Sequence, residues 1–329
     1  MKKIKIIEMG GTISAEGTDR LDRQNYTSGI YTGETFIKDL PELEELAVVD
    51  FFSFSQVSST ELDQTHWLKL RSLIAYFINK QNYDGIVIMH GTNTLEETAY
   101  FLHLTLPTSK PIVLVGSQRP YTALSSDAQL NLLQAVKVAK DDNSHNKGVL
   151  VALNNEINSA RDVTKTDTYQ VQAFTSLGTG FLGMIDPDDT IQYYREPMRL
   201  HTTQSDFSNL NITALPEVAI VYSYAGANGD IINSLVNSRA YQGIVIAGTG
   251  AGLMSPLEKS ALIKAQEAGM FIVRSSRVDN GRVTKTHSFI DSHFIAGDNL
   301  SPQKARILLM VSLLKYHEVP DIQKIFDTH

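Results

Sequence analysis

The sequence has no cysteine, no long apolar run and no cluster of basic residues. Without cysteine, disulfides, thiolate catalysis and Cys-ligated metal sites are excluded, while the redox compartment stays undetermined. No stretch approaches the roughly 20 apolar residues that a membrane-spanning helix needs, so we expect no membrane partner. Nucleic-acid binding is also disfavoured, because 36 acidic residues outnumber 29 basic ones and give a net charge of −7.

The N-terminal segment MKKIKIIEMGGT begins with basic residues, as a signal peptide does. Lys5 and Glu8 interrupt its apolar portion, which is also too short for the hydrophobic core of a signal peptide. We therefore interpret the segment as a first strand and expect a cytoplasmic protein. An exported form with a removed leader stays open as an alternative.

The length of 329 residues exceeds what one hydrophobic core usually organises, since a domain averages roughly 150 residues. Hydrophobic residues make up 42% of the chain and charged residues 20%, which is typical of a packed globular protein. The regular pattern fails between about 191 and 216, where a polar stretch intervenes as a linker would. We predict a larger N-terminal domain over 1–195, a linker over 196–216 and a smaller C-terminal domain over 217–329.

Short apolar, β-branched runs alternate with helical patterns along most of the chain. This alternation predicts an α/β fold with two domains, each a mainly parallel sheet flanked by helices. The expected strands are 3–9, 85–90, 111–115, 148–153, 218–222, 243–247 and 271–274. Residues 66–79 carry apolar side chains at helical spacing, and further helix starts are expected at Thr94 with a capping box, 125–127, 255–258 and 301–302.

Polar residues follow the predicted strands of the N-terminal domain, in the segments GGT at 10–12, HGTNT at 90–94, GSQRP at 116–120 and RDVTKT at 161–166. Ligands of open α/β sheets bind at the carboxyl ends of the strands, so these segments are where a site is expected. A threonine hydroxyl is a weak nucleophile and needs a base or a polarising neighbour. Two threonines, a lysine and a tyrosine could supply that relay, although any one such threonine alone is more often a helix cap or turn residue.

The other candidate motifs do not indicate a metal or cofactor site. His90 ends a buried strand and is interpreted as a core histidine rather than a base. The nine histidines show no ligand spacing such as H-E-x-x-H, so no metal is expected. The segment GTGAG at 248–252 is similar to a dinucleotide loop, but Leu253 stands where the third glycine belongs, and we expect no such cofactor.

Several segments together resemble the bacterial-type L-asparaginases: GGTIS at 10–14, NYTSG at 25–29, HGTNTLEETAYFL at 90–102, RDVTKT at 161–166, VRSSRV at 273–278 and NLSPQKARILL at 299–309. They occur in the family's order over nearly the whole chain. The resemblance implies an amidohydrolase for a small-molecule amide, with a larger N-terminal and a smaller C-terminal α/β domain. It also implies a homotetramer made of two intimate dimers, and neither a metal nor an organic cofactor.

The same resemblance implies roles for individual residues. Thr12 matches the primary nucleophile, and Tyr26 matches a tyrosine on a mobile flap that closes over the substrate. Thr92 and Lys165 match the second threonine and its lysine, which share protons with the site. Backbone amides around Thr12 and Thr92 would hold the developing oxyanion. The substrate-binding residues implied are Gly11, Ser59 (or, with the alignment shifted by one, Ser58), Thr60, Gly91 and Asn93.

Three positions depart from the family's pattern. Asn93 replaces an aspartate that binds the substrate's ammonium group, Thr60 replaces a glutamine or an acid, and Ala251 replaces an asparagine from the neighbouring subunit. No acid aligns with that subunit's glutamate near 280–290. A charge-assisted hydrogen bond contributes roughly 1.5–3 kcal/mol, so we expect weaker binding of a free α-amino group, and a Lys165 that is a better base.

Three functions are therefore considered. The first is an L-asparaginase that converts asparagine to aspartate and ammonia through an acyl-threonine intermediate. The second is an amidase of the same mechanism that prefers glutamine, a D-amide or an amide without the α-amino group. The third is a catalytically weak ligand-binding homologue, against which the presence of Thr12, Tyr26, Thr92 and Lys165 argues.

Overall fold

The computed structural model describes residues 1–289 and 292–329, and the chain divides into two compact units, Met1–Leu210 and Asn211–His329. The predicted linker over 196–216 spans the point of division, and its bounds stay a prediction. No helix in the described part of the chain is long and apolar enough to cross a membrane.

The first unit is built on an eight-stranded sheet in the order β12-β11-β8-β7-β6-β5-β1-β4. Its strands are β1 (Lys3–Gly10), β4 (Val48–Val57), β5 (Gly85–Met89), β6 (Ile112–Val115), β7 (Val149–Leu153), β8 (Glu156–Ser159), β11 (Gly183–Ile185) and β12 (Ile191–Tyr193). Neighbours from β4 to β7 run parallel, and neighbours from β7 to β12 run antiparallel. The mainly parallel sheet is therefore confirmed, although β4 and the antiparallel edge were not expected.

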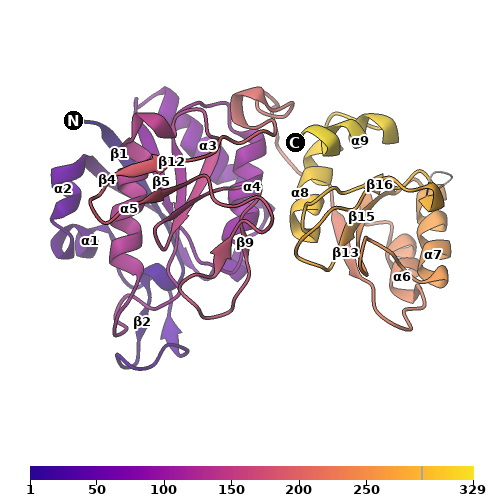
Figure 1. Cartoon of the computed structure of the whole chain (residues 1–329), viewed down its shortest axis with the longest axis horizontal. Coiled ribbons are helices and arrows are strands. Elements are labelled where there is room, and N and C mark those ends of the chain that lie inside the picture. Colours follow the sequence, from indigo (N-terminus) through magenta and orange to yellow (C-terminus); the bar gives the residue numbers. More distant parts are fainter. Residues whose placement is uncertain (290–291) are drawn as a thin grey trace. The chain divides into compact units, whose positions relative to one another are not determined.

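Helices cover both faces of this sheet (Figure 1). On one face lie α1 (Gly33–Asp39), α2 (Glu42–Leu46) and α5 (Ala128–Lys140), and on the other lie α3 (Gln64–Asn79) and α4 (Leu95–Thr105). On the first face Ile6 and Val87 of the sheet pack with Phe36 and Leu132 of the helices, and all four are fully buried. Burial of each such side chain contributes roughly 1.5–3 kcal/mol, which fixes the helices against the strands.

The strand order creates the place for a site. From β1 the chain passes to β4 on one side of β1, and then through α3 to β5 on its other side. In open sheets a crevice forms outside the carboxyl ends of the strands where the order reverses in this way. The loops that follow β1 and β5 are therefore neighbours at one edge of the sheet.

The helices whose starts the sequence predicted begin there, but of these starts only that of α7 (Pro256–Glu267) has a side-chain capping bond. The helix α5 begins after Asp127, and α7 begins with a complete capping box at Ser255. The capping box predicted at Thr94 was wrong, although α4 does begin directly after it. The Thr94 hydroxyl instead donates to the carbonyl oxygen of Ser59 at 2.8 Å, because a tertiary acceptor lies within its reach.

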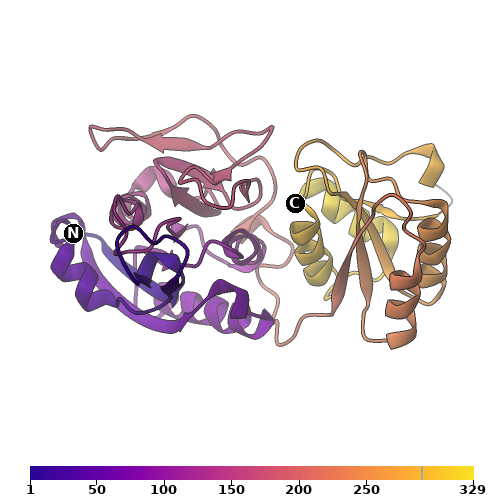
Figure 2. The same ribbon diagram turned by 90° about the horizontal axis from the view of Figure 1, so that it is seen from below.

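The second unit holds a parallel sheet in the order β13 (Val218–Tyr222), β14 (Gly243–Gly248), β15 (Phe271–Ser276) and β16 (Ile295–Ala296). Figure 2 shows α6 (Asp230–Ser238) and α7 on one face and α8 (Pro302–Ser312) on the other, and α9 (Val319–Thr328) ends the chain. Ile244 and Ile246 of β14 pack against Leu262 of α7 in its core. This arrangement confirms the predicted second α/β domain.

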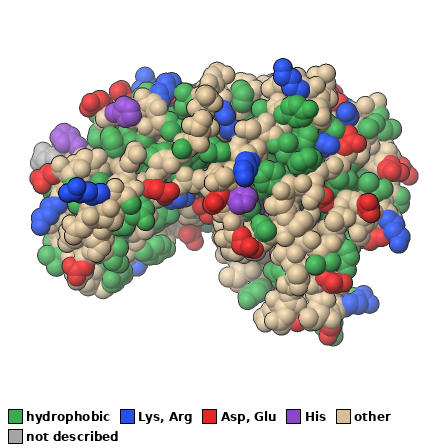
Figure 3. Space-filling view, turned by 180° about the vertical axis from the view of Figure 1, so that it is seen from behind, with side chains coloured by type: hydrophobic (Ala, Val, Ile, Leu, Met, Phe, Trp, Pro, Cys, Tyr) green, Lys and Arg blue, Asp and Glu red, His purple; other side chains and the backbone are tan. Residues whose placement is uncertain are grey.

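Two short hairpins leave the first unit near the ends of its central strands. One joins β2 (Glu16–Gly17) to β3 (Tyr26–Thr27), and the other joins β9 (Thr164–Lys165) to β10 (Phe174–Thr175). They carry two of the residues to which the sequence points, Tyr26 and Lys165. On the face shown in Figure 3, acidic and basic side chains are interspersed rather than gathered by sign.

Candidate active site

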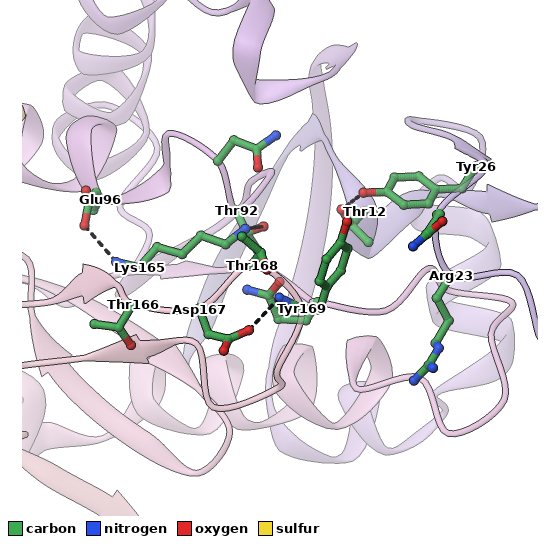
Figure 4. Close-up of a pocket in the computed structure, with 13 residues that line it drawn as sticks. Thr12, Arg23, Tyr26, Thr92, Glu96, Lys165, Thr166, Asp167, Thr168 and Tyr169 are labelled. Carbon is green, nitrogen blue, oxygen red and sulfur yellow. Dashed lines mark hydrogen bonds between the residues drawn. The ribbon is translucent and has the colours of Figure 1, made fainter.

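A cavity of about 600 Å³ opens in the first unit, beside the loops that follow β1 and β5. The residues that line it come from those loops, the first turn of α4, the loop after β6, the β2–β3 hairpin and the β9–β10 hairpin: Thr12, Arg23, Gln24, Tyr26, Thr92, Asn93, Glu96, Gln118, Lys165, Thr166, Asp167, Thr168 and Tyr169. The four residues predicted to be catalytic thus line one space. Figure 4 shows them converging from separate segments of the chain.

Thr12 owes its position to the two glycines before it. Gly11 has a φ of +84°, and a Cβ added there would lie 2.2 Å from the Cα of Gly91. The loops after β1 and β5 therefore touch through backbone alone, which only glycine permits. The chain then enters the short 3-10 helix η1 (Thr12–Ser14), where Thr12 is 7% exposed.

Tyr26 faces Thr12 from the β2–β3 hairpin. The two hydroxyl oxygens lie 3.1 Å apart, and either can be the donor. Tyr26 is 38% exposed and, in Figure 4, its hydroxyl points to Thr12. A hydroxyl pair of this kind can pass a proton away from Thr12 as its oxygen attacks.

Thr92 and Lys165 form the second pair. Lys165 Nζ donates to Thr92 Oγ1 at 2.8 Å, and the backbone N–H of Lys165 donates to Glu96 Oε2 at 3.0 Å. Burial lowers the pKa of the Lys165 ammonium, while the nearby carboxylates of Asp167 and Glu96 raise it to a smaller extent. The cavity therefore holds an amine that loses its proton more readily than a surface lysine does.

Ser59 differs from its neighbours in how its hydroxyl is used. It lies in η2 (Ser59–Glu61), is 2% exposed, and its Oγ finds no hydrogen-bond partner within the described part of the chain. The Ser58 hydroxyl is already bonded to Thr60, whose Oγ1 is 2.9 Å away. A Cβ added to Gly91 would lie 2.8 Å from Ser59 Oγ, so the buried hydroxyl lies against the loop that carries Thr92.

Not every predicted binding residue reaches the wall of the cavity. Asn93 does, whereas Gly11, Ser59 and Gly91 are buried next to the lining loops and Thr60 is exposed. Ala251 is exposed in the second unit. Residue 290, the last position of the segment 280–290 in which no matching acid was found, lies outside the described residues.

The family model “Asparaginase, N-terminal” matches residues 3–199, and “Glutaminase/Asparaginase C-terminal domain” matches residues 217–326. The chain belongs to the asparaginase family. It is 40% identical to L-asparaginase 2 of Bacillus subtilis (strain 168), over 100% of this chain and 87% of that one. It is 41% identical to the probable periplasmic L-asparaginase of Haemophilus influenzae, over 99% of this chain and 93% of that one.

A crystal structure shows the same relationship. The probable cytoplasmic L-asparaginase from Campylobacter jejuni superposes with a TM-score of 0.96 at 37% identity, covering 100% of both chains. The asparaginase family, the two-domain α/β fold and the amidohydrolase class predicted from the sequence are confirmed.

In this asparaginase, His90 is part of the scaffold. Its Nδ1 lies 2.7 Å from the carbonyl oxygen of Gly91, which can only accept, so Nδ1 carries the proton. Its Nε2 then accepts from the Thr98 hydroxyl at 2.9 Å, and Thr98 accepts from Trp67 Nε1 at 3.0 Å. Burial lowers the pKa of His90 to about 4, so the ring is neutral at physiological pH, as expected of a core histidine.

Several residues of the asparaginase cavity were not singled out from the sequence. Arg23 and Gln24 directly precede the NYTSG segment, and 167–169 directly follow RDVTKT. Glu96 was expected only to favour the start of a helix, yet it also holds the backbone of Lys165. Their positions beside recognised motifs were the only signal that could have indicated them. Within residues 1–289 and 292–329, no three His, Cys, Asp or Glu side chains gather as a metal site would require.

Proposed function

We propose that this family member hydrolyses the side-chain amide of asparagine to aspartate and ammonia through an acyl-threonine intermediate. The observation that carries the proposal is that the Thr12–Tyr26 and Lys165–Thr92 pairs open on one cavity. The relatives named L-asparaginase support the choice of substrate.

In the first half of the reaction, Thr12 Oγ attacks the amide carbonyl carbon and gives its proton to the Tyr26 hydroxyl, whose own proton passes on to the amide nitrogen. Backbone N–H groups around Thr12 and Thr92 stabilise the charge on the carbonyl oxygen. The C–N bond then breaks, and ammonia departs with the proton relayed through Tyr26. An ester between the substrate's acyl group and Thr12 remains.

In the second half, a water molecule attacks the ester carbonyl. The Lys165–Thr92 pair accepts the water proton, because the lowered pKa of the lysine allows its neutral form. The Thr12 oxygen leaves with the proton that the Lys165–Thr92 pair took from water, so the lysine returns to its neutral form, and the acid product is released. No metal and no organic cofactor takes part in the proposed route.

The proposed substrate contacts lie around the Thr92 end of the cavity. A buried hydroxyl without a partner, as at Ser59, is suited to bind a substrate carboxylate. Gly11 and Gly91 allow the close backbone approach that brings this hydroxyl near, and Thr60 shapes the loop through its bond with Ser58. Asn93 lines the cavity and meets the substrate's α-nitrogen.

Asn93 also favours a second candidate, an amidase of the same mechanism with an altered preference. A carboxamide attracts an ammonium group less than a carboxylate does. Glutamine, a D-amide or an amide without an α-amino group would then compete with asparagine. A weakly catalytic binding protein is the third candidate, and the intact hydroxyl and lysine pairs argue against it.

We also propose assembly as a homotetramer of intimate dimers and a cytoplasmic location. The family resemblance supports the assembly, and the likeness to a probable cytoplasmic L-asparaginase supports the location. The Haemophilus influenzae relative, named as periplasmic, keeps the exported alternative in view. Sedimentation of the purified protein and cell fractionation test the two statements separately.

The test of the proposed function is ammonia release from a panel of L-asparagine, L-glutamine, D-asparagine and succinamate. We expect release from L-asparagine, and a loss of at least about a thousandfold in Thr12→Ala. Thr65→Ala, an exposed threonine on α3, is the matched control and keeps full activity. Binding without ammonia release from any of the amides would contradict the proposal and favour the binding protein.

A further inference from the structure

A second cavity of about 450 Å³ adjoins the first one within the same unit. The two share Arg23, Gln24, Gln118 and Tyr169 in their linings. The space open to a ligand is therefore larger than the immediate surroundings of Thr12.

The second cavity lies on one particular side of the nucleophile. In Figure 4, Lys165 and Glu96 lie at one end of the first cavity and Arg23 at the other, with Thr12 between them. Arg23 belongs to the lining of the second cavity, whereas Thr92 and Lys165 do not. The extra space thus continues from the flap end and leads away from the lysine end.

This placement decides which part of a substrate would enter it. Under the proposed function, the acyl part of the substrate lies near Ser59 and Asn93, in loops joined by the bond from Thr94 to the Ser59 carbonyl. With the scissile carbonyl at Thr12, the leaving nitrogen points to the flap end. Ammonia needs no further room there, so the second cavity fits a substituent on that nitrogen.

The charges of the second cavity indicate what kind of substituent fits. Its lining includes two arginines, Arg23 and Arg119, and one acidic residue, Asp22. Arg119 Nη1 also donates to the carbonyl oxygen of Ser125. The Asp22 carboxylate already accepts hydrogen bonds from the backbone N–H groups of Gln24 and Asn25. Two cations against one occupied carboxylate favour an anion, and guanidinium groups match a carboxylate in particular.

We propose that this site also cleaves β-aspartyl dipeptides, in which the side-chain carboxyl of aspartate is joined to the amino group of a second amino acid. The free carboxylate of that second amino acid binds Arg23 and Arg119. The inference rests on the proposed function, since it uses the same nucleophile and the same acyl end of the cavity.

The bonds balance as in amide hydrolysis. Thr12 Oγ forms an ester with the aspartyl carbon, and the isopeptide C–N bond breaks. The leaving nitrogen takes the Thr12 proton, relayed through the Tyr26 hydroxyl at the flap end, and departs in the amine of the free second amino acid. Water then hydrolyses the ester, releasing aspartate and restoring Thr12.

The test compares L-asparagine, β-aspartyl-glycine and β-aspartyl-glycinamide, with aspartate release as the readout. The glycine and glycinamide leaving groups differ only in the terminal carboxylate. We expect kcat/KM for β-aspartyl-glycine to exceed that for the glycinamide by about tenfold. Arg23→Gln should lower this ratio at least about threefold, because one of two guanidinium partners is removed.

Arg20→Gln is the matched control, since Arg20 is exposed on the same loop and lines neither cavity. It should leave the ratio unchanged, and thermal unfolding should show both variants folded. If L-asparagine is hydrolysed while neither dipeptide is, or if the wild-type ratio is one, the inference is overturned and the proposed function stands. If none of the three substrates yields Thr12-dependent aspartate, the proposed function fails as well.

Discussion

Among the single residues of the site, Lys165 depends most on its surroundings. Burial lowers its pKa, and the carboxylates of Asp167 and Glu96 only partly oppose that effect. Position 93 adds no further carboxylate, because it holds asparagine. The amine therefore becomes neutral at a lower pH than an exposed lysine would, which suits a base that works with a threonine hydroxyl.

Replacing Lys165 by arginine tests this role. The guanidinium keeps the positive charge but does not lose its proton in the working range of pH. We expect kcat to fall by about 10²–10⁴-fold with little change in KM. The wild-type rate rises with pH as the lysine loses its proton, and this rising limb should be absent from the pH–rate profile of Lys165→Arg.

The exposed Lys38→Arg serves as the control for the chemical change itself. It should reproduce the wild-type profile. A Lys165→Arg enzyme that retains the rising limb would show that another group provides the base.

The Asn93→Asp variant tests the departure from the family's pattern. A carboxylate at this position attracts the substrate's ammonium group, so KM for L-asparagine should fall about tenfold. The same carboxylate favours the charged form of Lys165, so the rising limb should move to higher pH. Steady-state kinetics over a pH series measure both effects.

Succinamate, which lacks the α-amino group, is the internal control for Asn93→Asp, because its KM should not fall. Equal changes for the two substrates would mean that position 93 does not meet the α-nitrogen. If the rising limb of the pH–rate profile does not move, the residue at position 93 does not influence the pKa of Lys165.

The sequence predicted the residues of the site that lie in recognisable motifs. Thr12, Tyr26, Thr92 and Lys165 each stand in such a segment, and all four line one cavity. Arg23 and Arg119 were not predicted as ligand contacts, because the sequence around a loop arginine does not show whether its side chain faces a cavity or solvent. Only the folded loops bring the two to one space.

Among the elements, the loops after β1 and β5 form the least adjustable contact. Gly11 and Gly91 let the two backbones touch, and each loop carries one catalytic threonine. His90 fixes the second loop from beneath, since its Nδ1–H donates to the Gly91 carbonyl. The relative positions of Thr12 and Thr92 therefore depend on buried contacts that no substrate reaches.

Thr98 on α4 can be used to test that support. Its hydroxyl accepts from Trp67 Nε1 and donates to His90 Nε2. Thr98→Val therefore leaves the indole nitrogen of Trp67 and Nε2 of His90 buried without these partners. We expect the free energy of unfolding to fall by about 1–3 kcal/mol in urea titrations. Thr98→Ser keeps the hydroxyl, so its free energy of unfolding should fall by less than that of Thr98→Val. A valine variant that is more stable than the serine variant would contradict the assigned hydrogen bonds.

On the scale of the whole molecule, the sequence predicted the two sheets better than their edges. Buried parallel strands such as β5 and β14 are continuous apolar runs with clear ends, and both were expected. The edge strands β8, β11 and β12 have three or four residues, too few to show a period. The strand β4 is half exposed along its length, so its pattern did not stand out.

The two units differ in what they contribute to the candidate site. Every residue that lines the two cavities belongs to the unit Met1–Leu210. The hydroxyl and lysine groups to which the chemistry is assigned therefore all belong to the first unit. The tetramer and the linker bounds stay predictions.

The central claim is that Thr12 becomes covalently acylated, and trapping the intermediate tests it most directly. The protein is mixed with L-asparagine, quenched in acid within the first turnovers, and digested for mass spectrometry. We predict that the peptide containing Thr12 gains the mass of an aspartyl group on that residue, and that Thr12→Ala gains none. An aspartyl group on a different residue, or unchanged ammonia release by Thr12→Ala, would contradict the account.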